Sequence, residues 1–367
     1  MSEYNWRKER EKYRPAFQQT EEKATEAPVQ TATMFSRSKI FIAAGCLFAA
    51  AVILLGVFAL KGKESSAQFT EIVEKHKTAV GLVALTVELE NDKKVTIPIG
   101  TAWALSPNRF ATNGHVAVGL KGTLQEFIKN NVTALLAAEA EKNGSKSLKE
   151  FLDKLGNQQD TVIESTAKKV FASIKNVRGD IIINGTRNKS YPITFVQIHK
   201  NYGAVNTQFN PDVAVLTIDG KHDNFFKLAD KSTLYSLKSG VPVAFLGFPM
   251  ENLDKSNVNV DNPIASMQSG IVVAVSDFEM KDAGRDGNFL LRHNLPATGG
   301  ASGSPIFNRN GEVVALLYAI NIVGQVQSNG SNTVITRAPS GVQINFGVRA
   351  DLLEGLGNAV AFNEFMK

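Results

Sequence analysis

The amino-acid sequence predicts an all-β fold of two antiparallel barrels, with helices inserted into the first barrel. Short runs rich in β-branched and aromatic residues fall into two groups, and turn residues separate the runs. Val80–Leu89 and Val95–Ile99 belong to the first group, and Val241–Phe248 and Val313–Ile320 belong to the second. From about residue 122 to 177, apolar residues recur at helical spacing instead. This segment is the predicted helical insertion.

Three segments precede the first strand. Residues 1–39 are polar and charged and show no sustained apolar period, so we expect a disordered cytoplasmic tail. Residues 40–60 form an uncharged apolar run, long enough as a helix to cross a hydrocarbon layer of about 30 Å. This run predicts one transmembrane helix that anchors the chain in a lipid bilayer. Residues 61–77 are a charged connector.

Two other interpretations of the apolar run stay open. A cleaved signal peptide has a shorter apolar core and a brief basic start, whereas 39 polar residues precede this run. Ala44-Gly45-Cys46 is a weak signal for lipid attachment at Cys46. Lys and Arg residues flank both sides of the run, and long domains cross membranes largely regardless of charge. We therefore expect the tail inside the cell and the folded domain outside.

The first strands are predicted to form a meander. Val80–Leu89 and Val95–Ile99 are joined by Asn91-Asp92, a hairpin signal. Gly100–Leu105 and Arg109–His115 continue the meander, so His115 is expected at the end of a strand-like run. The insertion then follows as three amphipathic helices, with apolar residues recurring over Leu124–Leu135, Leu148–Leu155 and Ile163–Ile174.

Strands resume after the helices. The remaining first-group runs are Ile181–Ile183, Ile193–Val196 and Val213–Leu216; the second group is Val241–Phe248, Ser269–Val275, Phe289–Leu291, Val313–Ile320 and Val342–Val348. The main domain is expected to span residues 78–350, followed by a C-terminal segment, residues 351–367.

Composition excludes several classes of protein. The hydrophobic fraction of 43% and the charged fraction of 20% are those of an ordinary folded protein. The net charge is +5, but the basic residues are spread along the chain, so no nucleic-acid partner is expected. Cys46 is the one cysteine, which excludes an intramolecular disulfide. We expect no metal and no organic cofactor.

Three short motifs predict acyl-transfer chemistry. In Gly299–Pro305, glycines flank Ser302 on both sides, an arrangement that exposes a hydroxyl while backbone N–H groups converge on one point. His115 lies in the segment 111–116, and Asp212 begins an apolar run. Taken singly, these motifs are also compatible with a tight turn, a structural histidine and a strand-initiating aspartate.

Together the motifs resemble chymotrypsin-fold serine proteases. Gly300-Ala301-Ser302-Gly303-Ser304-Pro305 is similar to the nucleophile signature of that family, and the segment 297–308 is similar to the Deg (high-temperature-requirement) and glutamyl-endopeptidase branches. Thr112–Val116 and Asp212–Leu216 resemble the histidine and aspartate segments of Deg-type proteases. The chain order His115, Asp212, Ser302 is that of chymotrypsin-type enzymes. The resemblance implies two six-stranded barrels.

The resemblance also implies roles for individual residues. Ser302 is the nucleophile, His115 is the general base, and Asp212 orients the histidine. The N–H groups of Gly300 and Ser302 form the oxyanion hole. Ser304 is disfavoured as the nucleophile because it lacks the preceding Gly-x spacing and Pro305 follows it directly.

Departures from the family concern regulation and specificity. Few residues follow Ala350, so we expect no PDZ domain. Where glutamyl endopeptidases place a histidine and a threonine that bind an acidic P1 side chain, this chain has Leu317 and Ala297. We therefore expect a shallow apolar S1 pocket for small or aliphatic P1 residues, with the substrate-binding residues Ala297, Leu317, Tyr318 and Ala319.

The sequence thus predicts a membrane-anchored serine endopeptidase that acts on polypeptides in quality control or processing. Its protease domain would lie in the periplasm or outside the cell, attached to the inner membrane, and a homo-oligomer is one expected state. The alternatives are a protease-like binding or scaffold protein without a competent site, and a hydrolase of non-peptide esters. The insertion is either a satellite subdomain or a lid and assembly surface near the cleft.

Overall fold

The computed structural model describes residues 68–205, 209–250, 259–319, 322–329, 332–339 and 344–367. The predicted tail, the predicted transmembrane helix and residues 61–67 of the connector lie outside these ranges. Among the residues that are described, no helix combines the length and the apolar character needed to span a bilayer.

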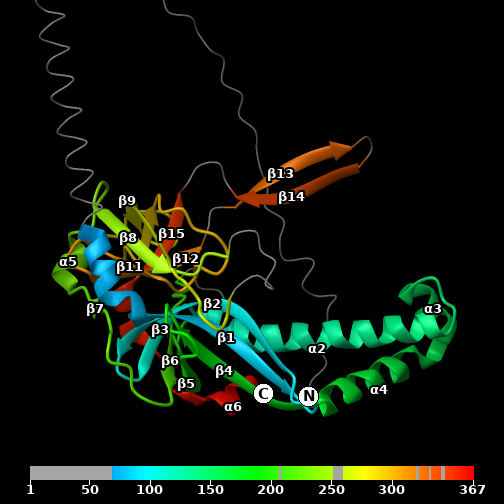
Figure 1. Cartoon of the computed structure of the whole chain (residues 1–367). Coiled ribbons are helices and arrows are strands. Elements are labelled where there is room, and N and C mark those ends of the chain that lie inside the picture. Colours follow the sequence, from blue (N-terminus) through cyan, green and yellow to red (C-terminus); the bar gives the residue numbers. More distant parts are fainter. Residues whose placement is uncertain (1–67, 206–208, 251–258, 320–321, 330–331, 340–343) are drawn as a thin grey trace, which may run out of the picture. The chain divides into compact units, whose positions relative to one another are not determined.

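The first barrel is a closed sheet of six antiparallel strands (Figure 1). Its strands run in the order β5-β4-β1-β2-β3-β6, and β6 pairs back with β5, which closes the sheet. A short strand, β16, is added at β5. The bounds are β1 Val80–Leu89, β2 Lys94–Ser106, β3 Arg109–Thr112, β4 Ile174–Ile183, β5 Ser190–Ile198, β6 Ala214–Ile218 and β16 Val360–Ala361.

The second barrel closes in the same way. Its order is β11-β8-β9-β10-β15-β12, with β11 paired to β12, and β7 is added in parallel to β12. These pairings confirm the predicted pair of six-stranded barrels. The bounds are β7 Lys227–Leu228, β8 Pro242–Gly247, β9 Ser266–Ser276, β10 Leu290–His293, β11 Pro305–Phe307, β12 Glu312–Ala319 and β15 Asn345–Arg349; helix α5 is Lys231–Tyr235.

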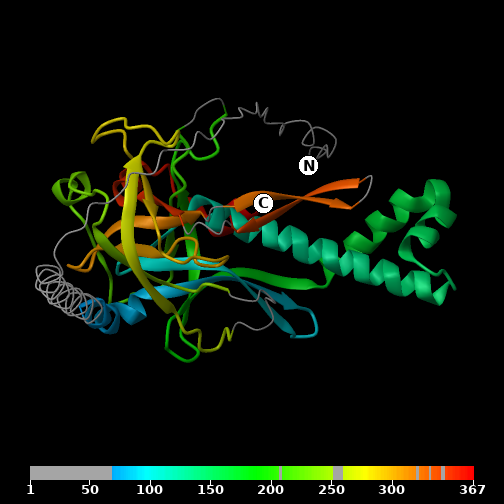
Figure 2. The same cartoon turned by 90° about the horizontal axis from the view of Figure 1, so that it is seen from above.

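The helical insertion is confirmed, but it begins earlier than predicted. It comprises α2 Gly114–Lys142, α3 Leu148–Leu155 and α4 Gln159–Ala172, and Figures 1 and 2 show α2 and α4 side by side. The expectation that His115 ends a strand-like run was wrong, because the strand ends at Thr112 and His115 lies in the first turn of α2. Glycines at 114, 119 and 122 lower the helix propensity of the N-terminal part of α2 and hid its start in the sequence.

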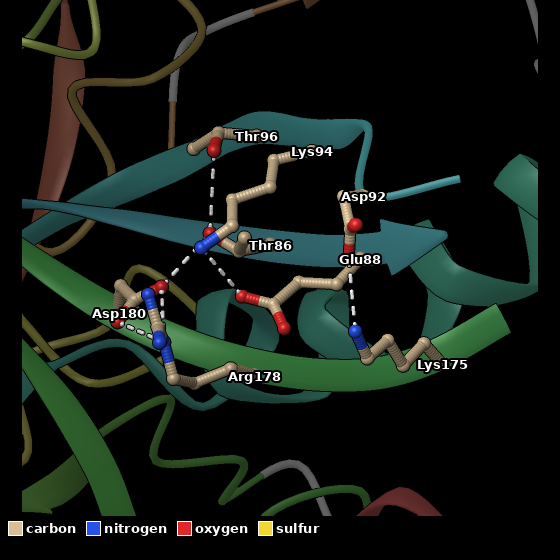
Figure 3. Close-up of polar contacts among 8 residues, drawn as sticks. All are labelled: Thr86, Glu88, Asp92, Lys94, Thr96, Lys175, Arg178 and Asp180. Atoms are coloured by element: carbon tan, nitrogen blue, oxygen red, sulfur yellow. Dashed lines mark hydrogen bonds and ion pairs between the residues drawn. The ribbon is translucent and has the colours of Figure 1, made fainter. Parts of the chain in front are cut away.

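A polar network fastens the return from the insertion to the first barrel. Asp180 of β4 is 2% exposed and accepts hydrogen bonds from Arg178 and from the hydroxyl of Thr86 in β1. Nearby, Lys94 of β2 pairs with Glu88 of β1, and Lys175 of β4 pairs with Asp92 in the turn between β1 and β2 (Figure 3). A buried carboxylate costs free energy unless it is paired and hydrogen-bonded, so Asp180 pins β4 to β1 in one register.

An aromatic chain joins the two barrels and the preceding helix. The ring of Trp103 in β2 meets Phe226 edge-on, and Phe226 stacks on Phe307 of β11 at a centroid distance of 5.5 Å. Residues 68–76, in the predicted connector, form a helix, and its Phe69 is 1% exposed and packs against Phe307. Burial of four large rings at this joint holds the barrels together.

Two further elements do not appear in the sequence analysis. Strands β13, Ile322–Asn329, and β14, Asn332–Pro339, form a hairpin between β12 and β15. The dipeptide Asn329-Gly330 is a strong hairpin signal that could have revealed it. The C-terminal segment contains the 3-10 helix η4, Ala350–Gly355, and helix α6, Phe362–Met366, whose Phe362 is buried in the first-barrel core.

Candidate active site

A short hydrogen bond couples His115 and Asp212. The Nδ1 atom of His115 lies 2.5 Å from Oδ2 of Asp212, and the backbone N–H of His115 donates to Oδ1 at 2.7 Å. The second bond also satisfies a backbone donor that has no partner within the first turn of α2. One carboxylate therefore fixes both the backbone and the ring of His115, and Nδ1 is occupied, so Nε2 is the nitrogen left for other chemistry.

The Asp212 carboxylate is buried, which strengthens its electrostatic influence on neighbouring groups. The Asp212 side chain is 3% exposed, whereas that of His115 is 40% exposed. The backbone of Asp212 is held as well, because the side-chain amide of Asn113 donates to the Asp212 carbonyl at 2.8 Å. Burial and then the charge of Asp212 raise the pKa of Tyr202 to about 12, and the same two causes raise the pKa of Tyr318. Tyrosines from both barrels thus lie near the carboxylate and stay protonated.

The loop that carries Ser302 is fastened to the first barrel. The N–H of Thr101 in β2 donates to the Ser302 carbonyl at 2.9 Å, and the Thr101 hydroxyl donates to the Gly300 carbonyl at 2.9 Å. A side-chain carbon at Gly303 would collide with the Thr101 carbonyl and with the Thr112 hydroxyl. It would also lie 3.3 Å from the nitrogen of Asn113, two residues before His115. The three sequence-predicted segments therefore meet at one seam between the barrels.

Ser302 and Ser304 have different surroundings. Ser302 is half-buried, and no hydrogen bond of its hydroxyl to the described part of the chain is seen. Ser304 is 0% exposed, and its hydroxyl donates to the Ala301 carbonyl at 2.6 Å. The Ser304 side chain also fills the space beside Gly247. Only the first of these hydroxyls has the exposure that a nucleophile needs.

Backbone hydrogen bonds of this loop single out two N–H groups. The carbonyls of residues 299, 300, 301 and 302 accept from Met250 N, Thr101 Oγ1, Ser304 N and Thr101 N, respectively. Of the N–H groups from Gly300 to Gly303, Ala301 bonds to Thr298 and Gly303 bonds to Leu317. Gly300 and Ser302 donate to no other group in the described ranges. These are the two donors that the sequence predicts for an oxyanion hole.

The planarity of the peptide bond orients these two donors. In a trans peptide the C=O and the next N–H point in opposite directions. The Gly299 carbonyl is held by Met250, so the Gly300 N–H points away from that residue; the Ala301 carbonyl is held by Ser304, so the Ser302 N–H points away from Ser304. Gly300 has a φ of +85°, a conformation open to glycine at little cost.

The predicted substrate-binding residues differ in burial. Leu317 is 1% exposed and belongs to the second-barrel core, while its backbone pairs with Gly303 and Ser304. Ala297 is partly buried against the same core, and Tyr318 is half-buried. Ala319 ends β12, and its side chain lies outside the described set. The apolar S1 pocket stays a prediction.

The remaining polar groups do not form a metal centre in the described ranges. Among those residues, no cluster of three His, Cys, Asp or Glu side chains is close enough to hold a metal ion. Burial lowers the pKa of the other four histidines, and that of His293 falls to about 4. Sequence reasoning missed Thr101, because an isolated threonine in a strand carries no signal that it contacts a loop about 200 residues away.

A family model agrees with this geometry. The model of the trypsin-like peptidase domain matches residues 100–316, which include His115, Asp212 and Ser302. The chain therefore belongs to the trypsin-like peptidase domain family. No protein of the curated collection matches the chain.

Several solved structures have a similar fold. They include the HtrA-type protease AlgW with a decapeptide (12% identity, TM-score 0.43), a Glu endopeptidase in complex with MPD (13%, 0.40) and the inactive form of the Rv3671c protease (14%, 0.38). The matches cover 78%, 76% and 77% of this chain and 65%, 88% and 89% of those chains, respectively. This chain thus spans slightly less than two thirds of the AlgW chain. At these identities the likeness concerns the fold alone.

Proposed function

We propose that this protein is a serine endopeptidase with the catalytic residues Ser302, His115 and Asp212. The observation that carries the proposal is the 2.5 Å contact between His115 Nδ1 and the buried Asp212 carboxylate, at the seam where the Ser302 loop is fastened. A carboxylate in that place holds the imidazole in the tautomer with Nε2 unprotonated, and it stabilises the imidazolium that forms during the reaction.

In the proposed reaction His115 acts as base and then as acid in each of two half-reactions. His115 takes the proton of the Ser302 hydroxyl as Oγ attacks the scissile carbonyl, and it then protonates the leaving amine. The oxyanion of the tetrahedral intermediate accepts hydrogen bonds from the N–H groups of Gly300 and Ser302. Water then attacks the acyl-enzyme while His115 takes a proton from it; the bond between the acyl carbon and Ser302 Oγ breaks, His115 returns the proton to Oγ, and the new carboxyl end of the peptide leaves. The chemistry needs no metal or organic cofactor.

The substrate class and the location extend this proposal. Family membership supports polypeptide substrates, and the side chains of Ala297, Leu317 and Ala319 support small or aliphatic P1 residues. The apolar run at residues 40–60 supports anchoring in the inner membrane with the protease domain outside the cytoplasm. In that place the enzyme would degrade or process misfolded and membrane-proximal proteins.

Labelling with a fluorophosphonate probe tests the proposed nucleophile. The full chain in detergent should react when folded and should fail to react after heat unfolding. Ser302→Ala should abolish labelling and lower kcat by up to roughly 10⁶-fold, whereas Ser304→Ala should still be labelled. A folded wild-type protein that is not labelled would support the binding or scaffold protein instead. Labelling that survives Ser302→Ala but not Ser304→Ala would move the nucleophile to Ser304.

A further inference from the structure

We propose that Thr101 is a positioning residue that holds the oxyanion hole in its working conformation. The inference rests on the proposed function, because it concerns the N–H groups of Gly300 and Ser302. Thr101 lies in β2 of the first barrel, is 0% exposed and does not belong to the triad. It contacts the carbonyls on both sides of Ala301, in the middle of the loop.

The hydrogen-bond pattern leaves one place for the hydroxyl proton of Thr101. The N–H of Phe248 donates to Thr101 Oγ1 at 3.1 Å, and this oxygen lies 2.9 Å from the Gly300 carbonyl. A hydroxyl has a single proton, and a carbonyl can only accept. The Thr101 hydroxyl must therefore donate to Gly300, while it accepts from the second barrel. One side chain thus links the first barrel to two segments of the second.

This link matters because Gly300 is one of the glycines that make the loop flexible. Its φ is +85°, and a glycine populates either sign of φ, so the adjacent peptides can rotate at little cost unless their carbonyls are held. A rotated donor peptide turns its carbonyl toward the place where the oxyanion forms, and the charge there is then repelled. The Thr101 hydroxyl holds the carbonyl of the Gly300–Ala301 peptide, and the Thr101 N–H holds the carbonyl of the Ser302–Gly303 peptide. These peptides adjoin the ones that carry the Gly300 and Ser302 N–H groups, so fixing them limits the rotation of both donors.

The experiment replaces the hydroxyl without changing the shape of the side chain. Thr101→Val keeps the branched side chain but leaves the Gly300 carbonyl and the Phe248 N–H without this partner. We expect kcat for a peptide substrate to fall roughly 10- to 100-fold, somewhat less than the loss of a whole oxyanion donor, with KM within about threefold. Affinity for a peptide aldehyde, which forms a tetrahedral adduct, should fall in parallel with kcat/KM.

Two further variants at the same position separate positioning from folding. Thr101→Ser restores the hydroxyl and should keep kcat within about threefold of wild type. Thr101→Ala leaves room for a bridging water and should lie between the serine and valine variants, which keeps the test decisive if the valine variant does not fold. The expected order of kcat is therefore Thr, Ser, Ala, Val, per folded molecule.

Thr86→Val is the matched control. Thr86 is 4% exposed in β1 of the same barrel, and its hydroxyl donates to the buried Asp180 at 2.8 Å (Figure 3). Its replacement should lower the unfolding temperature but leave kcat and aldehyde affinity unchanged. The inference is overturned if Thr101→Val keeps the kcat of the control, or if Thr101→Ser is no better than Thr101→Ala. Peptidase activity that persists in the Ser302→Ala variant would instead refute the proposed function and this inference with it.

Discussion

The two barrels contribute to the candidate site in different ways. The first barrel contributes side chains, since the imidazole of His115 is hydrogen-bonded to the carboxylate of Asp212. Besides the Ser302 hydroxyl, the second barrel contributes backbone, since every carbonyl from residue 299 to 302 is bonded and the N–H groups of Gly300 and Ser302 are left over. The side-chain device, which is the bonded pair of His115 and Asp212, depends on a few atoms, so one isosteric substitution removes its function. The backbone device, which is the loop of residues 299–302, tolerates side-chain substitutions but fails when the chain is displaced.

The largest effect is expected in the side-chain device of the first barrel. Asp212→Asn keeps the shape, but an amide group can donate to His115 Nδ1, which favours the wrong tautomer. We expect kcat to fall by about 10⁴-fold, as for triads of this type. Steady-state peptide hydrolysis measures the loss.

Asp180→Asn is the matched control for this change. Asp180 is 2% exposed in the same barrel, and its carboxylate is bonded to Arg178 and Thr86 (Figure 3). Its replacement should lower stability and leave kcat close to wild type. Equal kinetic losses in both variants would show that burial of a carboxylate, and not its bond to His115, decides the rate.

A smaller effect is expected from displacing the backbone device. A side-chain carbon at Gly300 would lie 2.6 Å from the Phe248 carbonyl oxygen, and the φ of +85° is unfavourable for alanine. Gly300→Ala should therefore move the loop and lower kcat by roughly 10²- to 10³-fold, the value of one oxyanion donor. Gly311→Ala, at a φ of +74° in a turn of the second barrel, supplies the same backbone strain without the kinetic loss. A wild-type kcat for Gly300→Ala would contradict the proposed oxyanion hole.

The core of the second barrel carries a pH dependence of stability. Burial lowers the pKa of His293 from 6.5 to about 4, so below pH 6.5 the unfolded chain binds a proton that the folded chain refuses. The contribution of His293 to the free energy of unfolding is fully present above pH 6.5 and is lost as the pH falls toward 4. The loss between pH 7.5 and pH 5 is about 2 kcal/mol. Urea unfolding measures it, with His293→Gln as the comparison.

The glutamine variant separates His293 from the other buried histidines. Burial also lowers the pKa of His76, His199 and His222, and these act with the same sign in both proteins. His293→Gln should therefore lose less stability than wild type between the two pH values. Equal losses would show that the proton is taken up elsewhere.

The smallest effect is expected at the far end of the insertion. Replacement of residues 143–158, which contain α3, by a short Gly-Ser linker should change kcat/KM for small peptides by less than about twofold, because loop ends far from a site tolerate shortening. The His115 end of α2 stays intact in this variant. A loss above tenfold, or a change in oligomer size, would favour a lid or assembly surface over a satellite subdomain.

Local patterns accounted for much of the fold. A β-rich apolar run and Asn91-Asp92 predicted β1 with the bounds Val80–Leu89 that the structure shows, because strands and hairpins leave their signal in neighbouring residues. The hairpin β13–β14 was missed although the dipeptide Asn329-Gly330 is a hairpin signal in the sequence. The start of α2 was missed because glycines weaken the helical pattern around His115.

Short stretches of sequence were enough to predict the reactive groups: a serine among glycines, a histidine and an aspartate in a recognisable order, and two groups of strands to carry them. Each of these is a property of a residue and its near neighbours. The folded structure was needed to show that the Ser304 hydroxyl is buried and bonded and that Thr101 holds the Gly300 carbonyl. Such pairings join residues about 200 positions apart, and barrel closure, which no short stretch encodes, brings them together.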